Sequence, residues 1–334
     1  MSIFDKRVEF KPFEYPEIIK YKNSISHSFW LVSEWSFISD IQDFHTKLNP
    51  VEQSAIKNAM LAISQIEVSV KKFWSKLGDR FPKAEFDQVG ITFGESEVRH
   101  SDAYSHLIEI LGLNDSFTEL LQNPVIQGRV DYLTKYLRGA AENTNENYTL
   151  TLTLFSIFME NVSLFSQFLI IKAFNKHKNV LKDIDNVVQA TQKEELIHAL
   201  FGVYLIKQIK KEFPDWFNED FYEKLYRACR KACKAEEEIV DWIFSEGELD
   251  FLTKDTVKEF VRDRFNQSLE MIGGKPVFEI DHQKLIAVEW FNEEILAEAN
   301  TDFFHKRPVS YSKYTQSVGE GDLFDDEPQL QMAQ

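Results

Sequence analysis

The sequence has only two cysteines in 334 residues, Cys229 and Cys233. They stand four residues apart in a segment with helical periodicity, where such neighbours have Cβ atoms about 5–6 Å apart. A disulfide requires a Cβ separation of roughly 3.5–4.5 Å. We therefore expect both cysteines to be reduced packing residues, which leaves the chain without a redox-active thiol pair.

Glycine and proline are also scarce, with 12 and 9 residues, and no Asn-Gly or Asp-Gly pair marks a β-hairpin. Hydrophobic residues make up 43% of the chain and recur with helical spacing almost throughout. A chain of this length can form one large domain or two. Because breaks in the helical pattern are few, one large all-α domain fits better.

Positive charge is in deficit: the formal net charge is −16, and no block of Lys and Arg is present. Nucleic-acid binding requires a basic surface, so we expect no nucleic-acid partner. The absence of a run of 18 apolar residues argues against a membrane span. The N-terminus lacks the apolar core of a signal peptide, and a cytoplasmic location is the expectation.

The chain contains instead a repeated pattern, a glutamate followed three residues later by a histidine. It occurs at Glu97 and His100 and again at Glu195 and His198. Each copy lies in a segment that reads as a long helix, where residues three apart share one face. A further glutamate in an apolar helical run precedes each copy, by 30 and 35 residues. These are Glu67 and Glu160.

One copy of this pattern is weak evidence, because glutamate and histidine are common on solvated helix faces. Two helices with one glutamate each and two with Glu-x-x-His, however, supply the ligands of ferritin-like di-metal carboxylate bundles. Four carboxylates and two imidazoles balance the charge of two divalent ions, and without metal such a cluster would be costly to bury. Oxygen-rich ligation with one nitrogen per metal favours iron or manganese.

The helical pattern divides the chain as follows. We expect an extended arm at 1–23 and a first helix at 25–46 that carries Phe29, Trp30 and Trp35. Asn49 and Pro50 are the expected cap and first residue of a second helix, which runs to 77. Later helices are expected at 84–112, within 115–139, and at 141–175, 180–212, 218–246, 253–272 and 284–300.

The composition changes at residue 307, where the chain becomes polar and then acidic. We expect a helical domain at 1–306 followed by a flexible tail at 307–334. Leu323 and Phe324 lie inside the acidic run. A solvated terminus and a short motif that folds onto a partner both remain open for this tail.

With these helices assigned, the chain resembles the small, radical-generating subunit of class I ribonucleotide reductase from about residue 20 to the tail. Tyr104 stands four residues after the first histidine, in the place of that family's radical tyrosine. Trp30 matches the family's surface-to-metal tryptophan, and Glu194 matches the acid that links it to the metal-bound histidine. The segment from Trp290 to Tyr311 resembles the family's closing pattern, which includes a tail tyrosine.

The resemblance implies a ferritin-like bundle whose glutamates and histidines bind two metal ions per chain. It also implies a homodimer and a separate large catalytic subunit on which the tail docks. The cluster would store a one-electron oxidising equivalent and pass it through Trp30, Glu194 and Tyr311 or Tyr314 to a cysteine of the large subunit. Ribonucleotide reduction for DNA synthesis would follow there, with thiols that this chain does not carry.

The chain departs from the commonest form of this family at a position that bears on the metals. Glu67 stands where many family members have aspartate, and glutamate at this place is typical of subclasses that use manganese. We therefore expect manganese, iron or both, with manganese favoured. Lys71, one turn after Glu67, either snorkels to solvent or approaches the site, where it would tune the cluster or attract an anionic oxidant such as superoxide.

A second departure concerns the radical. Thr191 lies one turn before the second Glu-x-x-His, and with Lys71, Leu164 and Phe168 it forms the expected surroundings of the metals. A polar threonine makes a poor apolar cage for a long-lived tyrosyl radical. Tyr104 therefore either carries the radical or stands beside a metal-centred oxidant.

Two other functions are compatible with the ligand pattern. A single-chain di-metal hydroxylase or desaturase would need a substrate cavity beside the metals and no radical route. A ferritin-like metal-storage protein would be shorter and would not need Trp30, Glu194 or the tail tyrosines. Dependence on a large partner that binds the tail discriminates between these functions.

Overall fold

The fold was analysed in a computed structural model that describes residues 2–120, 122–139 and 144–295. Within these ranges the secondary structure is helical, apart from one isolated bridge between Leu249 and Leu252. The expected all-α fold is confirmed. The side chains of 68–71, 133 and 135–139 are outside the described part, and so is the whole tail at 307–334.

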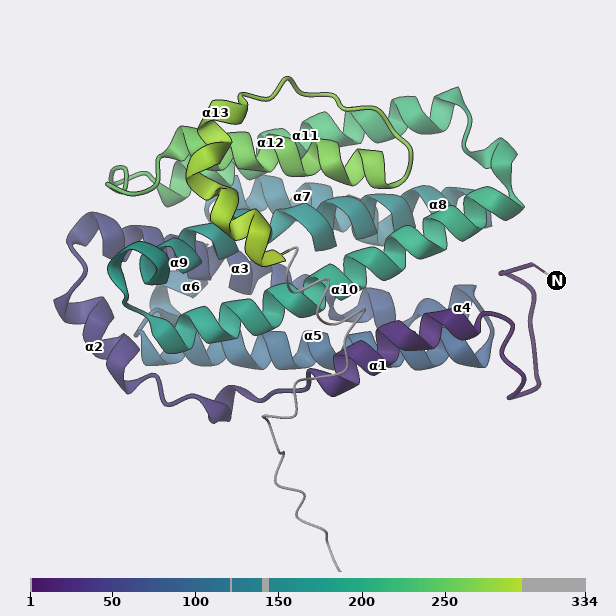
Figure 1. Ribbon diagram of the computed structural model, residues 1–334, viewed down its shortest axis with the longest axis horizontal. Coiled ribbons are helices and arrows are strands. Elements are labelled where there is room, and N and C mark those ends of the chain that lie inside the picture. The colour runs from purple at the N-terminus through teal and green to yellow at the C-terminus, as the bar shows by residue number, and fades with distance from the viewer. Residues whose placement is uncertain (1, 121, 140–143, 296–334) are drawn as a thin grey trace, which may run out of the picture.

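The centre of the molecule is a bundle of long helices (Figure 1). Helix α3 (Pro50–Ser75) packs against α5 (Ala84–Ile110). A continuous helical run is formed by α8 (Asn145–Leu154), the π-helical segment η3 (Phe155–Ser163) and α9 (Phe165–Lys178). Helix α10 (Lys182–Glu212) packs on this run and on α5.

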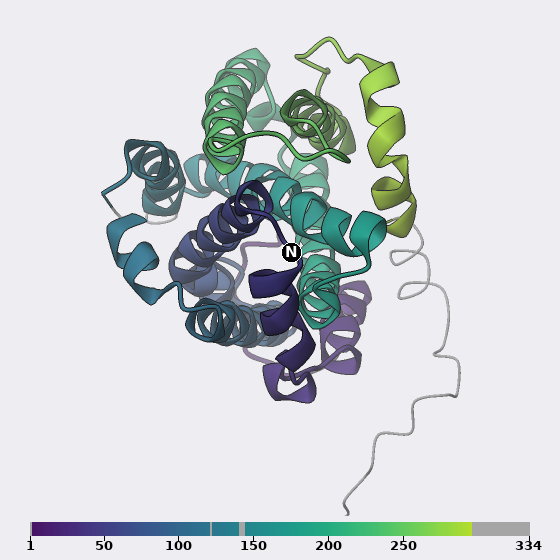
Figure 2. The same cartoon turned by 90° about the vertical axis from the view of Figure 1, so that its left-hand side faces the viewer.

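Further helices cover the bundle on two sides, as Figure 2 shows in a view turned by 90°. Helices α11 (Glu219–Ile243), α12 (Lys254–Met271) and α13 (His282–Leu285) lie together on one side, and α1 (Ile19–His27) and α2 (Ile38–Thr46) lie on the opposite side. The remaining short elements are η1 (Pro16–Ile18), η2 (Val32–Glu34), α4 (Leu77–Arg80), α6 (Asn114–Leu120), α7 (Pro124–Gly139), η4 (Pro214–Trp216) and η5 (Ile286–Val288).

The expected single helix at 25–46 is wrong. The chain leaves α1 at His27 and enters α2 at Ile38, so Trp30 lies in the connection rather than in a helix. Phe37 adopts a left-handed φ of 56°, and its N–H donates to Asp183 Oδ2 of α10 at 3.1 Å. This tertiary hydrogen bond holds the break, which the apolar spacing of the sequence does not indicate.

The expected extended arm at 1–23 is also wrong in part. Its last residues already form η1 and the beginning of α1. Ile3 is fully buried, and its N–H donates to Glu212 of α10 at 2.7 Å. Burial of one apolar side chain and a charge-assisted hydrogen bond therefore attach the N-terminal residues to the bundle.

The start of α3 follows its local sequence closely. Asn49 accepts from the N–H of Glu52 at 3.0 Å, and Glu52 accepts from the N–H of Asn49 at 2.9 Å. This reciprocal capping box, with Pro50 at the first helical position, satisfies donors that a helix start leaves free. The predicted cap is confirmed.

The run from Asn145 to Lys178 is long and apolar enough to cross a membrane, but the whole of its most apolar stretch is buried inside the protein. It is therefore a core helix. Cys229 and Cys233 are likewise buried on α11, and both are free thiols, as expected. The helix predicted at 284–300 begins as α13 and η5 and continues to residue 295, where the described part ends.

Candidate metal centre

The six candidate ligands converge at the centre of the bundle. They come from α3 (Glu67), α5 (Glu97 and His100), η3 (Glu160) and α10 (Glu195 and His198), and each is at most 2% exposed. They form two sets, and within each set the ligand atoms all lie within 4.8 Å of one another. One set comprises Glu97, Glu160, Glu195 and His198, and the other comprises Glu67, His100 and Glu195.

Two carboxylates lie between the two histidines. Glu195 approaches Nδ1 of His100 at 2.9 Å and Nδ1 of His198 at 3.4 Å. Glu97 approaches the same two nitrogens at 3.8 and 3.2 Å. Each carboxylate thus turns one of its oxygens toward His100 and the other toward His198, which is the arrangement that a bridging ligand requires.

The site contains buried polar atoms that have no hydrogen-bond partner. These are both carboxylate oxygens of Glu67 and of Glu97, Oε1 of Glu195, and Nδ1 of His100 and His198. An unpaired buried polar atom is costly, and a cluster of them in a native site calls for an ion or another partner. Four carboxylates and two neutral imidazoles fit two divalent cations in charge and in donor type.

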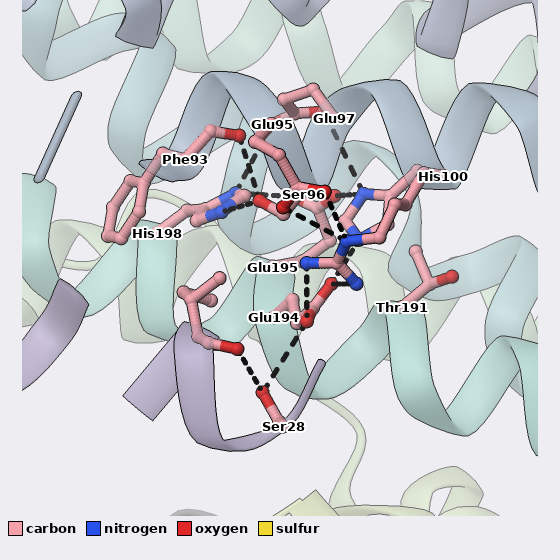
Figure 3. Close-up of polar contacts among 12 residues, drawn as sticks. Ser28, Phe93, Glu95, Ser96, Glu97, His100, Thr191, Glu194, Glu195 and His198 are labelled. Atoms are coloured by element: carbon pink, nitrogen blue, oxygen red, sulfur yellow. Dashed lines mark hydrogen bonds and ion pairs between the residues drawn. The ribbon is translucent and has the colours of Figure 1, made fainter. Parts of the chain in front are cut away.

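The outer nitrogens of both imidazoles are engaged, as Figure 3 shows. Nε2 of His100 lies 2.8 Å from Glu194, and Nε2 of His198 lies 3.0 Å from the hydroxyl of Ser96. Because Ser96 itself donates to the carbonyl of Phe93 at 2.8 Å, it accepts from the imidazole. Both histidines can therefore keep a proton on Nε2, which would leave Nδ1, between the carboxylates, available to bind a metal ion.

Burial and close neighbours shift the pKa values of the candidate ligands. Burial raises the pKa of Glu67 and of Glu160 well above the usual range, and neighbouring carboxylates raise both further. Burial opposes a charged imidazole, yet the carboxylates close to each ring hold the pKa of His100 and His198 well above normal. Burial also acts to raise the pKa of Glu195, but the close approach of Glu160 and both histidines keeps it well below normal.

A further polar group contacts Glu160. Trp74 on α3 is fully buried, and its indole N–H donates to Glu160 Oε1 at 2.9 Å. Sequence reasoning missed both this residue and Ser96. The available signal for Trp74 was its position seven residues, or two turns, after Glu67 on the same helix.

The residues expected to carry the radical lie on the other side of His100. Trp30 is 5% exposed and stacks on the His100 ring at 6.0 Å and 15°. Glu194 contacts His100, but the indole N–H of Trp30 has no hydrogen-bond partner. Arg99, which sequence reasoning missed, binds Glu194 at 3.1 and 3.2 Å and lies over the Trp30 ring at 5.5 Å.

Tyr104 is buried on α5, one turn after His100. Burial raises its pKa strongly, while the hydroxyl of Thr191 acts in the opposite direction. Thr191 donates its own hydrogen bond to the carbonyl of Val187 at 3.0 Å. A polar hydroxyl therefore does lie beside Tyr104, as the sequence suggested.

The remaining residues named from the sequence are two apolar side chains, one lysine and the two tail tyrosines. Leu164 and Phe168 are buried near η3 in apolar surroundings. The side chain of Lys71, and Tyr311 and Tyr314 altogether, lie outside the described residues.

Comparison with known proteins adds the family context. A family model described as "Ribonucleotide reductase, small chain" matches residues 7–284. A probable ribonucleoside-diphosphate reductase small subunit of Invertebrate iridescent virus 3 is 26% identical over 328 residues, covering 94% of this chain and 86% of that protein.

Three solved structures share the fold. The ribonucleotide reductase R2 subunit from Clostridium botulinum has a TM-score of 0.78 at 16% identity, covering 86% of this chain and 91% of that one. Dimanganese(II)-NrdF from Streptococcus sanguinis has a TM-score of 0.69 at 16% identity, with 88% and 99% covered. An R2-like ligand-binding oxidase with a Mn/Fe cofactor has a TM-score of 0.67 at 20% identity, with 78% and 94% covered.

Proposed function

This chain belongs to the family of ribonucleotide reductase small chains, and from that premise we propose which of its residues hold the metals and carry the radical. The family's function is that of a class I small subunit, which supplies the oxidising equivalent and works only with a large catalytic subunit. We assign two metal ions per chain to Glu67, Glu97, His100, Glu160, Glu195 and His198. The observation that carries this assignment is the set of buried ligand atoms without hydrogen-bond partners.

We assign Glu97 and Glu195 as the bridging ligands, because each faces both histidines. A Glu97→Ala, Glu195→Ala double variant should lose both metals, as measured by elemental analysis after loading and desalting. Glu95→Ala is a matched control, since Glu95 lies on α5 and is 48% exposed at its side chain. Full occupancy of two metals in the double variant would contradict the assignment.

The metals are manganese, iron or both, and we propose that at least one is manganese. Glu67 in the first ligand position supports this, as do the Mn/Fe and dimanganese cofactors of two proteins with the same fold. Metal analysis of protein expressed with both metals supplied, followed by electron paramagnetic resonance, tests it. A cluster that contains only iron under these conditions would contradict it.

When bound, the dinuclear cluster supplies a one-electron oxidising equivalent. Residues on the far side of His100 are arranged along the path by which this oxidising equivalent would leave the cluster. Glu194 accepts a hydrogen bond from Nε2 of His100, Arg99 donates two hydrogen bonds to Glu194, and Trp30 stacks on the imidazole. We assign Trp30 and Glu194 to radical transfer, with Tyr311 as the tail residue and Tyr314 as the alternative.

The partner is a large subunit, and we propose that residues 307–334 dock on it while 1–306 form the metal-binding domain of a cytoplasmic homodimer. The buried pair Cys229 and Cys233 supports a separate source of reducing thiols, because neither cysteine is accessible. The curated relative's name supports a nucleoside diphosphate substrate. Deoxynucleotide formation from diphosphates should require both subunits and disappear when 320–334 are removed. Substrate oxidation by this chain alone would indicate a di-metal oxidase instead.

A further inference from the structure

Trp74 makes a contact that the family assignment does not use. Its indole N–H donates to Oε1 of Glu160 at 2.9 Å, and both side chains are at most 2% exposed. We propose that Trp74 is a positioning residue for the ligand Glu160, which it restricts to binding metal through Oε2. This inference rests on the proposed metal site.

The two oxygens of Glu160 have different surroundings. Oε1 is occupied by the indole N–H, whereas Oε2 faces Nδ1 of His198 at 3.4 Å. By contrast, both oxygens of Glu67 and of Glu97 lack hydrogen-bond partners. Glu160 is thus held with Oε2 toward the candidate ligand His198 and Oε1 on the indole N–H of Trp74. A carboxylate fixed in this way acts as a terminal ligand through one oxygen rather than as a chelate or a bridge.

The orientation of Trp74 is itself fixed by aromatic neighbours on three other elements. Its ring lies 5.4 Å from Phe93 of α5, 5.7 Å from Phe155 of η3 and 5.8 Å from Phe201 of α10. The first two contacts are edge-on, at 86° and 79°. A side chain packed on three sides cannot change rotamer without displacing a ring, so the N–H direction is set before metal binds.

The π-helical segment explains how one indole contacts two residues of η3. Phe155 and Glu160 are five residues apart, which would point them in different directions on an α-helix. Hydrogen bonding from i to i+5 in a π-helix brings such residues onto one side instead. Trp74 therefore packs on Phe155 with its ring and binds Glu160 with its N–H, so it couples the local helix geometry to the ligand's orientation.

Loss of the N–H should free Oε1 and allow the Glu160 carboxylate to rotate toward the metals. Groups that orient metal ligands typically contribute about 10–100-fold to metal affinity. We expect Trp74→Phe to weaken Mn(II) binding by at least about tenfold on this basis. The carboxylate stretching bands in the Mn(II)-minus-metal-free infrared difference spectrum should also shift, since the binding mode of one carboxylate changes.

The experiment compares full-length chains by Mn(II) titration calorimetry and infrared difference spectroscopy. Trp242→Phe is the matched control, because Trp242 lies on α11 away from the site, and it should bind Mn(II) like wild type. A second variant replaces Trp74 with benzothienylalanine, which keeps the ring's shape and exchanges the N–H for sulfur. If the N–H positions Glu160, this variant should show the weakened affinity and the band shift of Trp74→Phe.

The results of these measurements distinguish a role of the Trp74 N–H from a role of ring packing, and both from a failure of the proposed metal site. Wild-type affinity and unchanged bands in the benzothienylalanine variant would overturn the proposal. The packing of the ring, without the N–H, would then be enough to orient Glu160, even if Trp74→Phe bound Mn(II) weakly or did not fold. Weakened binding without a band shift would overturn it too, since Glu160 would keep its binding mode. A wild-type chain that binds no Mn(II) or Fe(II) would instead overturn the metal site itself.

Discussion

His100 donates its Nε2 proton to Glu194 at 2.8 Å, while its other nitrogen faces the carboxylate of the next residue in the chain, Glu195, at 2.9 Å. Successive residues of α10 thus contact opposite edges of one imidazole. Glu194 fixes the tautomer, and Glu195 belongs to the metal site. Arg99 donates to both oxygens of Glu194 in turn. The orientation of His100 therefore depends on two side chains, Glu194 and Arg99, that are not themselves candidate ligands.

Removal of the Glu194 carboxylate should therefore weaken metal binding. In Glu194→Ala, His100 loses its acceptor and Arg99 loses a buried partner, and we expect Mn(II) affinity to fall by about 10–100-fold. Titration calorimetry measures this. Glu95→Ala removes the other carboxylate that Arg99 contacts, at 3.0 Å, and should leave the affinity near that of wild type. Equal losses in the two variants would indicate that only the charge balance around Arg99 matters.

The arrangement of the ligands was accessible from the sequence because it depends on local spacing. Residues three apart share a helix face wherever the helix is regular, so the two Glu-x-x-His pairs could be placed without tertiary information. The cap at Asn49 is equally local. The break between α1 and α2 was not accessible, since it depends on a hydrogen bond between Phe37 and Asp183, far apart in the chain.

The π-helical segment was missed for the same reason. Two buried arginines bind its carbonyl groups: Arg264 of α12 donates to Asn161 O at 2.8 Å, and Arg129 of α7 donates to Ser163 O. Burial lowers the pKa of Arg264 to about 9. Both arginines come from helices remote in sequence, and the apolar run around Glu160 reads the same for an α-helix as for a π-helix.

The metal-free protein should become less stable as pH rises. The raised pKa values of Glu67, Glu160, His100 and His198 mean that the folded state binds protons that the unfolded state releases. The free energy of unfolding then falls as pH increases above each ordinary pKa, 4.5 for glutamate and 6.5 for histidine. The lowered pKa of Glu195 has the opposite effect, but this is complete once pH exceeds 4.5.

Thermal melting of metal-free and Mn(II)-loaded protein between about pH 6 and pH 8 measures this dependence. The metal-free melting temperature should decrease over that interval. Loaded protein should not follow, because Mn(II) displaces the protons and binds more tightly at higher pH. Glu67→Gln removes one titrating group and should flatten the metal-free slope. A metal-free protein that gains stability with pH would contradict the prediction.

Tyr104→Phe should retain substantial turnover with the large subunit. The change removes one buried hydroxyl that lies beside Thr191 and has no hydrogen-bond partner. It should therefore alter the free energy of unfolding by less than about 1.5 kcal/mol, the upper end of what one hydrogen bond contributes. Tyr148→Phe, at another buried tyrosine in α8, controls for the loss of a phenol from the core. Loss of turnover together with a radical signal, in the Tyr104 variant alone, would instead identify Tyr104 as the radical carrier.

The tail should take part in radical transfer through Tyr311, in addition to docking. The exit from the small subunit needs a side chain that can be oxidised near the partner's surface, which restricts the choice to tyrosine or tryptophan. Beyond Arg307 the sequence offers only Tyr311 and Tyr314, and both lie outside the described residues. We prefer Tyr311 because its sequence surroundings resemble those of the family's tail tyrosine. Replacement by phenylalanine keeps the ring and removes the ionisable hydroxyl.

Tyr311→Phe should therefore bind the large subunit nearly as well as wild type and load both metals, yet form no deoxynucleotide. Binding is measured by calorimetry or pull-down, metal content by elemental analysis, and product by chromatography. Tyr314→Phe is the matched control and should turn over normally. The reverse result, with only Tyr314→Phe inactive, would move the role three residues along the tail. Normal turnover by the double variant would exclude both tyrosines from the route, because phenylalanine cannot replace the oxidisable phenol, and the tail's contribution would then be docking alone.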